Sequence, residues 1–457
     1  SGSGTQWNVS YTVSSSDTNG AVSFTIDVSD NAGNTSQRTT TTNSTSVTKV
    51  GTSSLTTTVT GTSGLQIGSD IDGEATGDNS GWSVSLNSDG TIVAIGAYYN
   101  NGNGGDSGHV RVYQYSNSSW SQLGSDIDGE AANDYSGWSV SLSSDGTILA
   151  IGAVNNNSYI GHVRVYQYSN SSWSQLGGDI DGEHSPENSG RSVSLSSDGT
   201  ILAIGAPYND GNGNESGHVR VYQYSNSSWN QLGSDIDGEA AGDNSGYSVS
   251  LNSDGTIVAI GANRNDANGN NSGHVRVYER DTNEAIGWKQ LGSDIDGEAN
   301  GDESGYSVSL NSDGTILAIG AFFNDGTIVN STVGHVRVYQ YSNSSWSQLG
   351  DDIDGEAETD RSGWSVSLSG DGTILAIGAY WNDGNSGSSN DNRGHVRLYQ
   401  YSGSSWSQLG SDIDGENAGD NFGWSVSLSN NGDIVAIGAP YNLSLIHISE
   451  PTRLEPI

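Results

Sequence analysis

The sequence repeats one acidic pentapeptide, Asp-Ile-Asp-Gly-Glu, and each copy is followed by another acid eight residues after its first Asp. The seven copies begin at Asp70, Asp126, Asp179, Asp235, Asp294, Asp352 and Asp412. Four carboxylates within nine residues are the oxygen ligands that Ca²⁺ prefers, so Ca²⁺ is the one cofactor we consider. The candidate ligands are Asp126, Asp128, Glu130, Asp134, Asp235, Asp237, Glu239 and Asp243. The alternative is that Asp-Gly makes turns and the acids solvate a surface loop.

Aromatic residues precede the most variable loops of the repeat. Rings on a loop-bearing surface could stack on a sugar, and the alternative is that they pack beneath the loops. The candidate ligand-contacting residues are Tyr98, Tyr99, Tyr208, Asp210, Phe322, Phe323, Tyr380 and Trp381.

Each of six repeats carries the sequence Gly-His-Val-Arg. The histidines are His109, His162, His218, His274, His335 and His395. A recurring histidine suggests a metal site, but the copies lie on different blades and cannot converge, so we expect each to make a structural hydrogen bond. The arginines are Arg111, Arg164, Arg220, Arg276, Arg337 and Arg397. A buried arginine needs a partner, so each is expected to pair with a carboxylate of its own or the adjacent repeat.

No arrangement of residues indicates catalysis. The sequence has no nucleophile elbow, no histidine pair at helical spacing and no phosphate-binding loop, so it predicts a protein that is not an enzyme. A propeller hydrolase or lyase would need paired carboxylates about 5–10 Å apart in a cleft.

The negative net charge restricts the classes of partner that the chain can bind. With 53 acidic and 15 basic residues the chain has a net charge of −38, which disfavours nucleic acids and anionic membranes. No apolar run is long enough for a membrane helix. Cysteine is absent, which excludes disulfides and thiolate sites, and methionine is absent too, so we expect the chain to begin inside a longer protein.

The repeat that positions these residues has four strand-length runs. In the second copy these are residues 138–142, 147–153, 162–168 and 173–177, separated by turn-forming polar segments. Seven such units, spaced by 53–60 residues, predict an all-β fold: a seven-bladed β-propeller of four-stranded blades over residues 65–442. The segment 65–68 is expected to complete the last blade, whose third strand is missing. The order of the strands predicts that the acidic loops and the variable loops lie on one face of the propeller.

The repeats resemble FG-GAP repeats, the units of integrin-α propellers. The resemblance lies in Phe422-Gly423-Trp-Ser-Val followed by Ile437-Gly-Ala-Pro440, and in related frames such as Ser136-Gly137 and Gly205-Ala206-Pro207. Many FG-GAP repeats hold calcium between their first two strands, on acids spaced along the loop. The matching stretch here, from Ser141 to Leu149, is acidic only at Asp145, so we expect no calcium in these loops.

The two ends of the chain differ from the repeats. Residues 1–44 resemble the end of a bacterial Ig-like adhesin domain, and residues 45–64 are expected to be a Thr/Ser-rich linker. Residues 443–457 resemble a translated sequencing adapter of the kind found in metagenomic assemblies, and are expected to be non-native.

These features together predict a non-catalytic, monomeric adhesion or ligand-binding propeller of a secreted or cell-surface bacterial protein. Its expected partner is a protein or glycan on an extracellular surface. Three alternatives stay open: a glycan-binding lectin, a structural spacer and, less favoured, a propeller hydrolase or lyase.

Overall fold

The computed structural model describes residues 65–326, 332–384 and 391–442, together with strand segments at 20–21, 26–29, 35–38, 48–49 and 447–450. The chain divides into a smaller N-terminal unit and a larger unit, Ser63–Arg453. In the smaller unit β1 (Gly20–Ala21) pairs with β4 (Thr48–Lys49), and β2 (Ile26–Ser29) pairs with β3 (Thr35–Arg38). Most of the predicted Ig-like module and linker lies outside the described residues.

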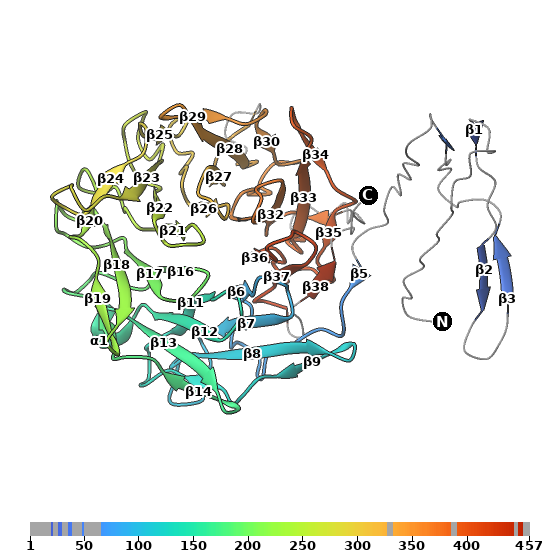
Figure 1. Ribbon diagram of the computed structural model, residues 1–457, viewed down its shortest axis with the longest axis horizontal. Helices are drawn as coiled ribbons and strands as arrows, with labels where there is room; N and C mark the ends of the chain where they lie inside the picture. Colours follow the sequence, from blue (N-terminus) through green and yellow to red (C-terminus); the bar gives the residue numbers. More distant parts are fainter. Residues whose placement is uncertain are drawn as a thin grey trace. The chain divides into compact units, whose positions relative to one another are not determined.

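The larger unit is an all-β propeller in which each repeat forms one antiparallel sheet around a common axis (Figure 1). In the second blade the order is β11 (Ser136–Leu142), β12 (Ile148–Ala153), β13 (His162–Ser169) and β14 (Ser172–Gln175), counted from the centre outwards. The short strand β15 (Ile180–Asp181) also pairs with β13, so the outermost strand is made of two pieces. The Ile-Asp of the acidic pentapeptide is therefore part of the sheet.

The other complete blades repeat this plan. The first has β6 (Ser83–Leu86), β7 (Ile92–Ala97), β8 (His109–Ser116), β9 (Ser119–Gln122) and β10 (Ile127–Asp128). The third has β16 (Ser192–Leu195), β17 (Ile201–Ala206), β18 (His218–Ser225), β19 (Ser228–Gln231) and β20 (Ile236–Asp237). The fourth has β21 (Ser248–Leu251), β22 (Ile257–Ala262), β23 (His274–Arg280), β24 (Trp288–Gln290) and β25 (Ile295–Asp296). The fifth has β26 (Ser307–Leu310), β27 (Ile316–Ala321), β28 (His335–Ser342), β29 (Ser345–Gln348) and β30 (Ile353–Asp354). The sixth has β31 (Ser365–Leu368), β32 (Ile374–Ala379), β33 (His395–Tyr401), β34 (Trp406–Gln408) and β35 (Ile413–Asp414).

The structure supports the predicted propeller but not the full count of seven blades: the described residues form six complete five-stranded blades and one smaller sheet. The seventh repeat contributes β36 (Ser425–Leu428) and β37 (Val435–Gly438), and its sheet has four strands. Its third strand is β38 (His447–Glu450), and its fourth is β5 (Leu65–Gln66) from the beginning of the propeller. Both chain ends thus close the ring in place of the repeat's own missing strand.

Hydrogen bonds between neighbouring innermost strands run around the whole ring. In each strand a serine hydroxyl accepts the main-chain N–H of a leucine in the next strand, as Ser141 Oγ does from Leu195 at 3.0 Å. The same bond joins the seventh repeat to the first, from Leu86 N to Ser427 Oγ at 2.9 Å. These serines alternate with core valines in the repeated Ser-Val-Ser-Leu run. The serine side chains therefore hold neighbouring inner strands together.

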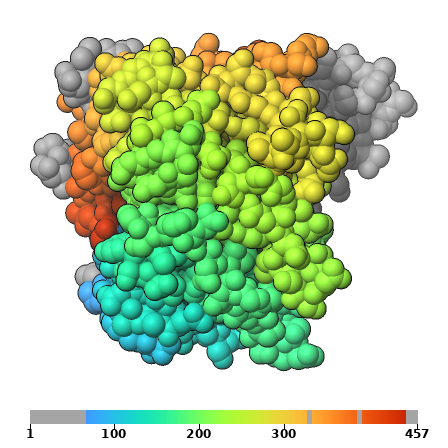
Figure 2. All heavy atoms as spheres, turned by 90° about the vertical axis from the view of Figure 1, so that its left-hand side faces the viewer, coloured from blue at the N-terminus to red at the C-terminus, as the bar shows by residue number. Residues whose placement is uncertain are grey.

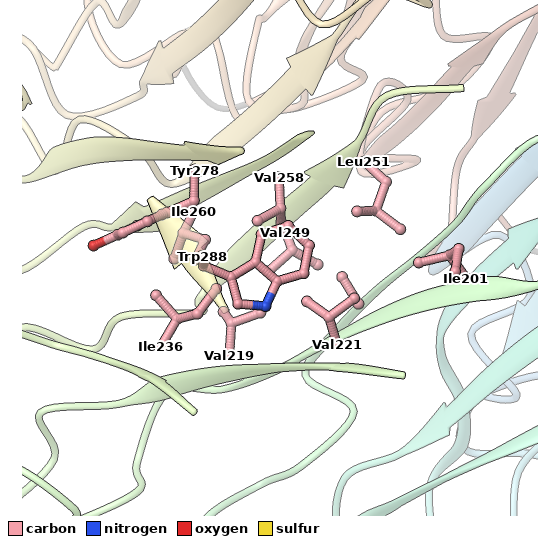
Figure 3. Packing of buried hydrophobic residues seen from close by; sticks show 11 residues of the cluster. Ile201, Val219, Val221, Ile236, Val249, Leu251, Val258, Ile260, Tyr278 and Trp288 are labelled. Atoms are coloured by element: carbon pink, nitrogen blue, oxygen red, sulfur yellow. The ribbon is translucent and has the colours of Figure 1, made fainter. Parts of the chain in front are cut away.

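The hydrophobic core lies between blades. One cluster joins Val219 and Ile236 of the third blade to Val258, Ile260 and Trp288 of the fourth (Figure 3). Equivalent clusters lie at the other blade contacts. Successive repeats consequently lie side by side around the rim, as the colour sequence of Figure 2 shows.

A tryptophan of each outer strand fixes neighbouring blades. The indole Nε1 of Trp173 donates a 2.7 Å hydrogen bond to the carbonyl of Leu123 in the preceding blade. Gly124, the next residue, has φ +80, and a Cβ there would lie 2.9 Å from Trp173 Cδ1. A glycine is required at this place for both reasons.

The connection between β12 and β13 contains the only α-helical segment in the described part of the chain, α1 (Asn156–Tyr159). It is not a regular helix, because Asn157 and Ser158 have left-handed backbone angles. No helix among the described residues is long and apolar enough to cross a membrane.

Candidate functional site

The two ends of the blades carry different kinds of loop. In the second blade, Ser136, Ala153, His162 and Asp181 are paired in series, so the beginning of β11, the end of β12 and the beginning of β13 lie at one end of the sheet. We call the surface formed by these ends in all repeats the loop face, and the opposite surface the turn face. The acidic pentapeptides and the variable loops both lie on the loop face, as predicted from the strand order.

Seven side chains form a closed ring at the centre of the loop face, which we call the aromatic ring. Each is the residue just before the Ser-Val-Ser-Leu run, and six of the seven are aromatic. Neighbouring ring centroids lie 4.5–4.9 Å apart, as between Trp82 and Trp138. Arg191 completes the ring between Trp138 and Tyr247, with its guanidinium carbon 5.1 and 4.2 Å from their centroids. The members are Trp82, Trp138, Arg191, Tyr247, Tyr306, Trp364 and Trp424.

A second layer of aromatic side chains packs against this ring. Tyr98, Phe322 and Tyr380 are buried, with 5%, 2% and 3% of their surface exposed. Their centroids lie 4.2–4.5 Å from the ring members Trp82, Tyr306 and Trp364. Burial raises the pKa of the Tyr380 hydroxyl to about 12. These three residues were predicted to contact a ligand, but they are buried and pack beneath the aromatic ring.

The remaining predicted contacts lie further out on the loop face. Tyr99, Tyr208, Phe323 and Trp381 are half-buried, so part of each ring faces solvent. Asp210 is exposed, but its carboxylate accepts the main-chain N–H of Glu215 at 2.8 Å and so stabilises its own loop.

Two further side chains belong to this aromatic surface: Tyr441, another aromatic residue that precedes a variable loop, and Arg361, which was missed from the sequence. Tyr441 has 47% of its surface exposed and lies beside Trp424, at a centroid distance of 5.9 Å. The guanidinium carbon of Arg361 lies 3.4 Å from the Trp381 centroid, a cation–π contact. A hollow of about 150 Å³ borders Tyr441 and is also lined by Gly73, Asn79 and Asn442.

The acids of one pentapeptide contribute to two different clusters. Asp126 lies with Glu74 and His109, whereas Glu130 lies with His162 and Asp179, and the ligand atoms within each cluster are no more than 4.8 Å apart. The structure thus joins the first Asp of one pentapeptide to the Glu of the preceding one, around a histidine. The predicted calcium ligands of a single loop are divided between neighbouring blades, and a His–Glu–Asp set replaces the expected all-oxygen set.

The same division holds for the second candidate loop. Asp235 lies with Glu183 and His218, while Glu239 lies with His274 and Asp294. Asp128 and Asp237 give their main-chain carbonyls to Arg164 and Arg276, at 2.8 and 2.7 Å.

The acid eight residues after each first Asp is buried and braces the loops. Asp134 accepts the N–H of Ala131 at 2.8 Å, closing its own loop. Asp243 accepts the amide of Asn265 at 3.0 Å, which joins the acidic loop to the variable loop. Asp134 and Asp243 are each only 3% exposed. Their carboxylates therefore hold the loops in position and do not face solvent as the predicted calcium ligands would.

Each of the six arginines joins two blades. Arg164 is 6% exposed, donates to the Asp128 carbonyl and lies 3.5 Å from a carboxylate oxygen of Glu130 in the pentapeptide of the preceding blade. The other five, Arg111, Arg220, Arg276, Arg337 and Arg397, have the same two partners at the equivalent places. The partner glutamates are half-exposed, so solvent weakens the ion pairs and leaves the carbonyl contact as the constant element.

The turn face has a different chemistry. Asp145 accepts hydrogen bonds from the N–H and hydroxyl of Thr147 at 2.9 and 2.8 Å. Burial opposes ionisation of this carboxyl, but the bonds from Thr147 outweigh it and hold its pKa below the usual range. A funnel of about 160 Å³ at the centre of this face is lined by leucines and by small polar residues such as Ser144 and Asn430. Main-chain hydrogen bonds link these small residues around the funnel, so their N–H groups are engaged.

Comparison with known proteins shows which family model matches parts of the chain and which solved structures share its fold. The FG-GAP repeat model matches residues 71–113, 236–278, 353–395 and 413–444, each match beginning at the isoleucine of the pentapeptide. No curated protein matches the sequence. The structure resembles Kuenenia stuttgartiensis hydrazine synthase at a TM-score of 0.54 and 11% identity, over 84% of this chain and 98% of that one. It also resembles a putative 6-phosphogluconolactonase from Bacteroides uniformis at a TM-score of 0.50 and 11% identity, over 74% and 86% of the two chains. Likenesses at this identity concern the fold alone; the chain therefore has four segments similar to FG-GAP repeats and folds as an all-β propeller.

Proposed function

We propose that the chain is a non-catalytic ligand-binding propeller of an extracellular adhesive protein, and that it binds its partner with the centre of the loop face. The observation that carries this proposal is the aromatic ring and its half-exposed neighbours, surrounded by the carboxylates of the pentapeptides. Aromatic residues are enriched at the centres of protein interfaces because they bury a large area at a small entropic cost.

The chemistry of this surface favours a partner that presents basic side chains. The aromatic surface already holds two guanidinium groups of its own, Arg191 over Tyr247 and Arg361 over Trp381. Around it lie half-exposed carboxylates such as Glu130 and Glu298, each with 44% of its side-chain surface exposed. A net charge of −38 adds long-range attraction for a cationic partner.

A neutral glycan is the second candidate ligand, favoured by one specific observation. The exposed ring of Tyr441 borders the hollow that Asn79 and Asn442 also line, which combines a stacking surface with amide hydrogen-bonding groups.

An array of arginine-rich and lysine-rich peptides together with neutral glycans tests the proposal. The test variant is the double change Trp381→Ala and Tyr441→Ala on the loop face. The matched control is the double change Tyr168→Ala and Tyr401→Ala. Both tyrosines are half-buried and lie near the turn-face ends of their strands. We expect the wild type and the control to bind basic peptides and the test variant to lose at least tenfold in affinity. Binding to glycans alone would establish the second candidate. Equal loss in both variants, or no binding to either class, would contradict the proposal.

A further inference from the structure

The third repeat contains the one pentapeptide loop that gains a histidine. After the pentapeptide glutamate the second repeat reads Ala131-Ala-Asn-Asp134, whereas the third reads His184-Ser-Pro-Glu187. Glu187 is longer by one methylene than the aspartate found at this place in the other repeats, and it is fully buried.

The longer acid reaches the histidine that opens β18. Glu187 Oε1 lies 3.3 Å from Nε2 of His218, and Asp235 Oδ2 lies 3.5 Å from Nδ1 on the other side of the imidazole ring. Glu183 completes the surroundings: its ligand atoms lie within 4.8 Å of those of His218 and Asp235, and also within 4.8 Å of those of His184 and Glu187. Glu183 is therefore shared by two groups, one with His218 and Asp235 and the other with His184 and Glu187.

Glu187 is held beside Nε2 of His218 by its own main-chain contacts. Its Oε2 accepts the main-chain N–H groups of Glu183 and His184 at 2.8 and 2.9 Å, which holds the carboxylate in place. Its Oε1 faces His218 Nε2 and is 3.6 Å from Arg220. A carboxylate facing Nε2 favours the proton on that nitrogen, which leaves the lone pair of Nδ1 pointing at Asp235. A lone pair and a carboxylate repel each other unless a cation lies between them.

The equivalent histidine of the next blade gives an independent indication. His274 is 1% exposed, and its Nδ1 makes no hydrogen bond to any residue that the structure describes. This nitrogen faces carboxylate oxygens of Glu239 and Asp296, each at 4.0 Å. A buried imidazole nitrogen directed at two acids, without a bonding partner, is an arrangement that a bound cation would complete.

We propose that Glu183, His184, His218 and Asp235 bind a divalent transition-metal ion of the Zn²⁺ or Co²⁺ type, with Glu187 as the positioning residue that orients His218. Imidazole and carboxylate ligands together suit these metals, whereas Ca²⁺ takes oxygen ligands. The 3.5 Å from Nδ1 to Asp235 is close to the separation of about 3.3 Å between ligands of a tetrahedral site with bonds of about 2.0 Å. Glu183 and Asp235 have 43% and 30% of their side-chain surface exposed, so an ion can enter from solvent. This site is independent of the partner-binding role proposed above.

Titration of the metal-free chain with Co²⁺ at pH 7.5 tests the site, because tetrahedral histidine and carboxylate ligation produces a strong visible absorption, whereas hydrated Co²⁺ absorbs only weakly. We expect one tight equivalent with that absorption, competition by Zn²⁺ but not by a tenfold excess of Ca²⁺, and a raised melting temperature. His184→Ala, at an exposed position where the other repeats have no histidine, is expected to keep the fold and weaken Co²⁺ binding at least tenfold. Glu187→Asp, which restores the aspartate of the other repeats, is expected to weaken it less.

The matched control is Asp313→Asn, which removes an exposed carboxylate from the turn face and is expected to leave Co²⁺ binding unchanged. Absence of the Co²⁺ absorption in the wild type would overturn the proposal. Unchanged affinity in His184→Ala, or displacement of Co²⁺ by Ca²⁺, would overturn it equally, since the ion would then be held by carboxylates alone.

Discussion

The guanidinium carbon of Arg191 lies 4.2 Å from the centroid of the Tyr247 ring, in the one place of the aromatic ring that lacks an aromatic residue. The positive charge faces the electron-rich surface of Tyr247 on one side and of Trp138 on the other. The ring is thereby closed without a gap, and the loop face has at its centre a surface that already accommodates a cation.

Arg191→Ala is expected to lower the free energy of unfolding by about 1–2 kcal/mol, because a desolvated cation–π contact is worth about that much. Arg191→Trp is expected to cost less, since tryptophan occupies the equivalent place in four other repeats. Urea unfolding measures both changes, and Arg264→Ala, at an exposed loop-face arginine, is the control. If Arg191→Ala behaved like the control, Arg191 would contribute nothing to the ring.

Trp173→Phe is expected to lower the free energy of unfolding by about 1–2 kcal/mol. The phenylalanine keeps most of the packing but leaves the carbonyl of Leu123 without its indole donor. Gly124→Ala should be at least as harmful, because its Cβ would meet the same indole and the backbone has φ +80. Thermal unfolding of both variants checks this, and an unchanged melting temperature would show that the contact between these blades is not stabilising.

Arg220→Met is expected to destabilise the propeller by about 2–4 kcal/mol. The substitution removes the donor to the Asp181 carbonyl and leaves the buried Glu187 without its arginine. Arg280→Met is the control, because it makes the same substitution at an exposed arginine at the end of β23. Equal denaturation midpoints for the two variants would refute a structural role for the buried arginines.

The burial of His335 is expected to make the free energy of unfolding depend on pH. Burial above all, and then the charge of Arg337, lower its pKa from 6.5 to about 4. Between these values the unfolded chain binds a proton that the folded chain does not, so this histidine's contribution is complete above pH 6.5 and is lost as the pH falls towards 4. The difference in unfolding free energy between the wild type and His335→Gln should therefore narrow over that range. A constant difference from pH 7 to pH 4 would show that the pKa is not lowered.

Most of the fold could be predicted from the sequence because the repeat determines it locally. Period-two alternation in Ser-Val-Ser-Leu and the buried run of residues 147–153 indicated strands, and the turn residues between them indicated antiparallel pairing. The exact number of blades could not be predicted from the repeat, because the closing sheet takes β38 from the tail, and the sequence of the tail does not follow the repeat. The two-part outer strand was also missed, since the pentapeptide reads as a loop and only pairing of Ile180 with Val163 shows that it belongs to the sheet.

The candidate site was predicted only in part, because it depends on contacts between repeats. The loop face and its aromatic character followed from strand order. The aromatic ring had a visible signal, an aromatic residue before Ser-Val in six of seven repeats, but only the close approach of the inner strands makes it a ring. The pairing of Glu183 with His218 and Asp235 brings together three successive segments of two blades, and spacing along one loop cannot reveal it.

Hydrogen–deuterium exchange of the whole chain, with and without a saturating arginine-rich peptide, tests the central claim most directly. We expect slower exchange in the loop-face segments next to the aromatic ring, such as residues 98–108 and 378–384, and no change in the turns around Asp145 and Asp313. Protection confined to the turn face, or no protection at a peptide concentration that saturates binding, would contradict a ligand site at the centre of the loop face.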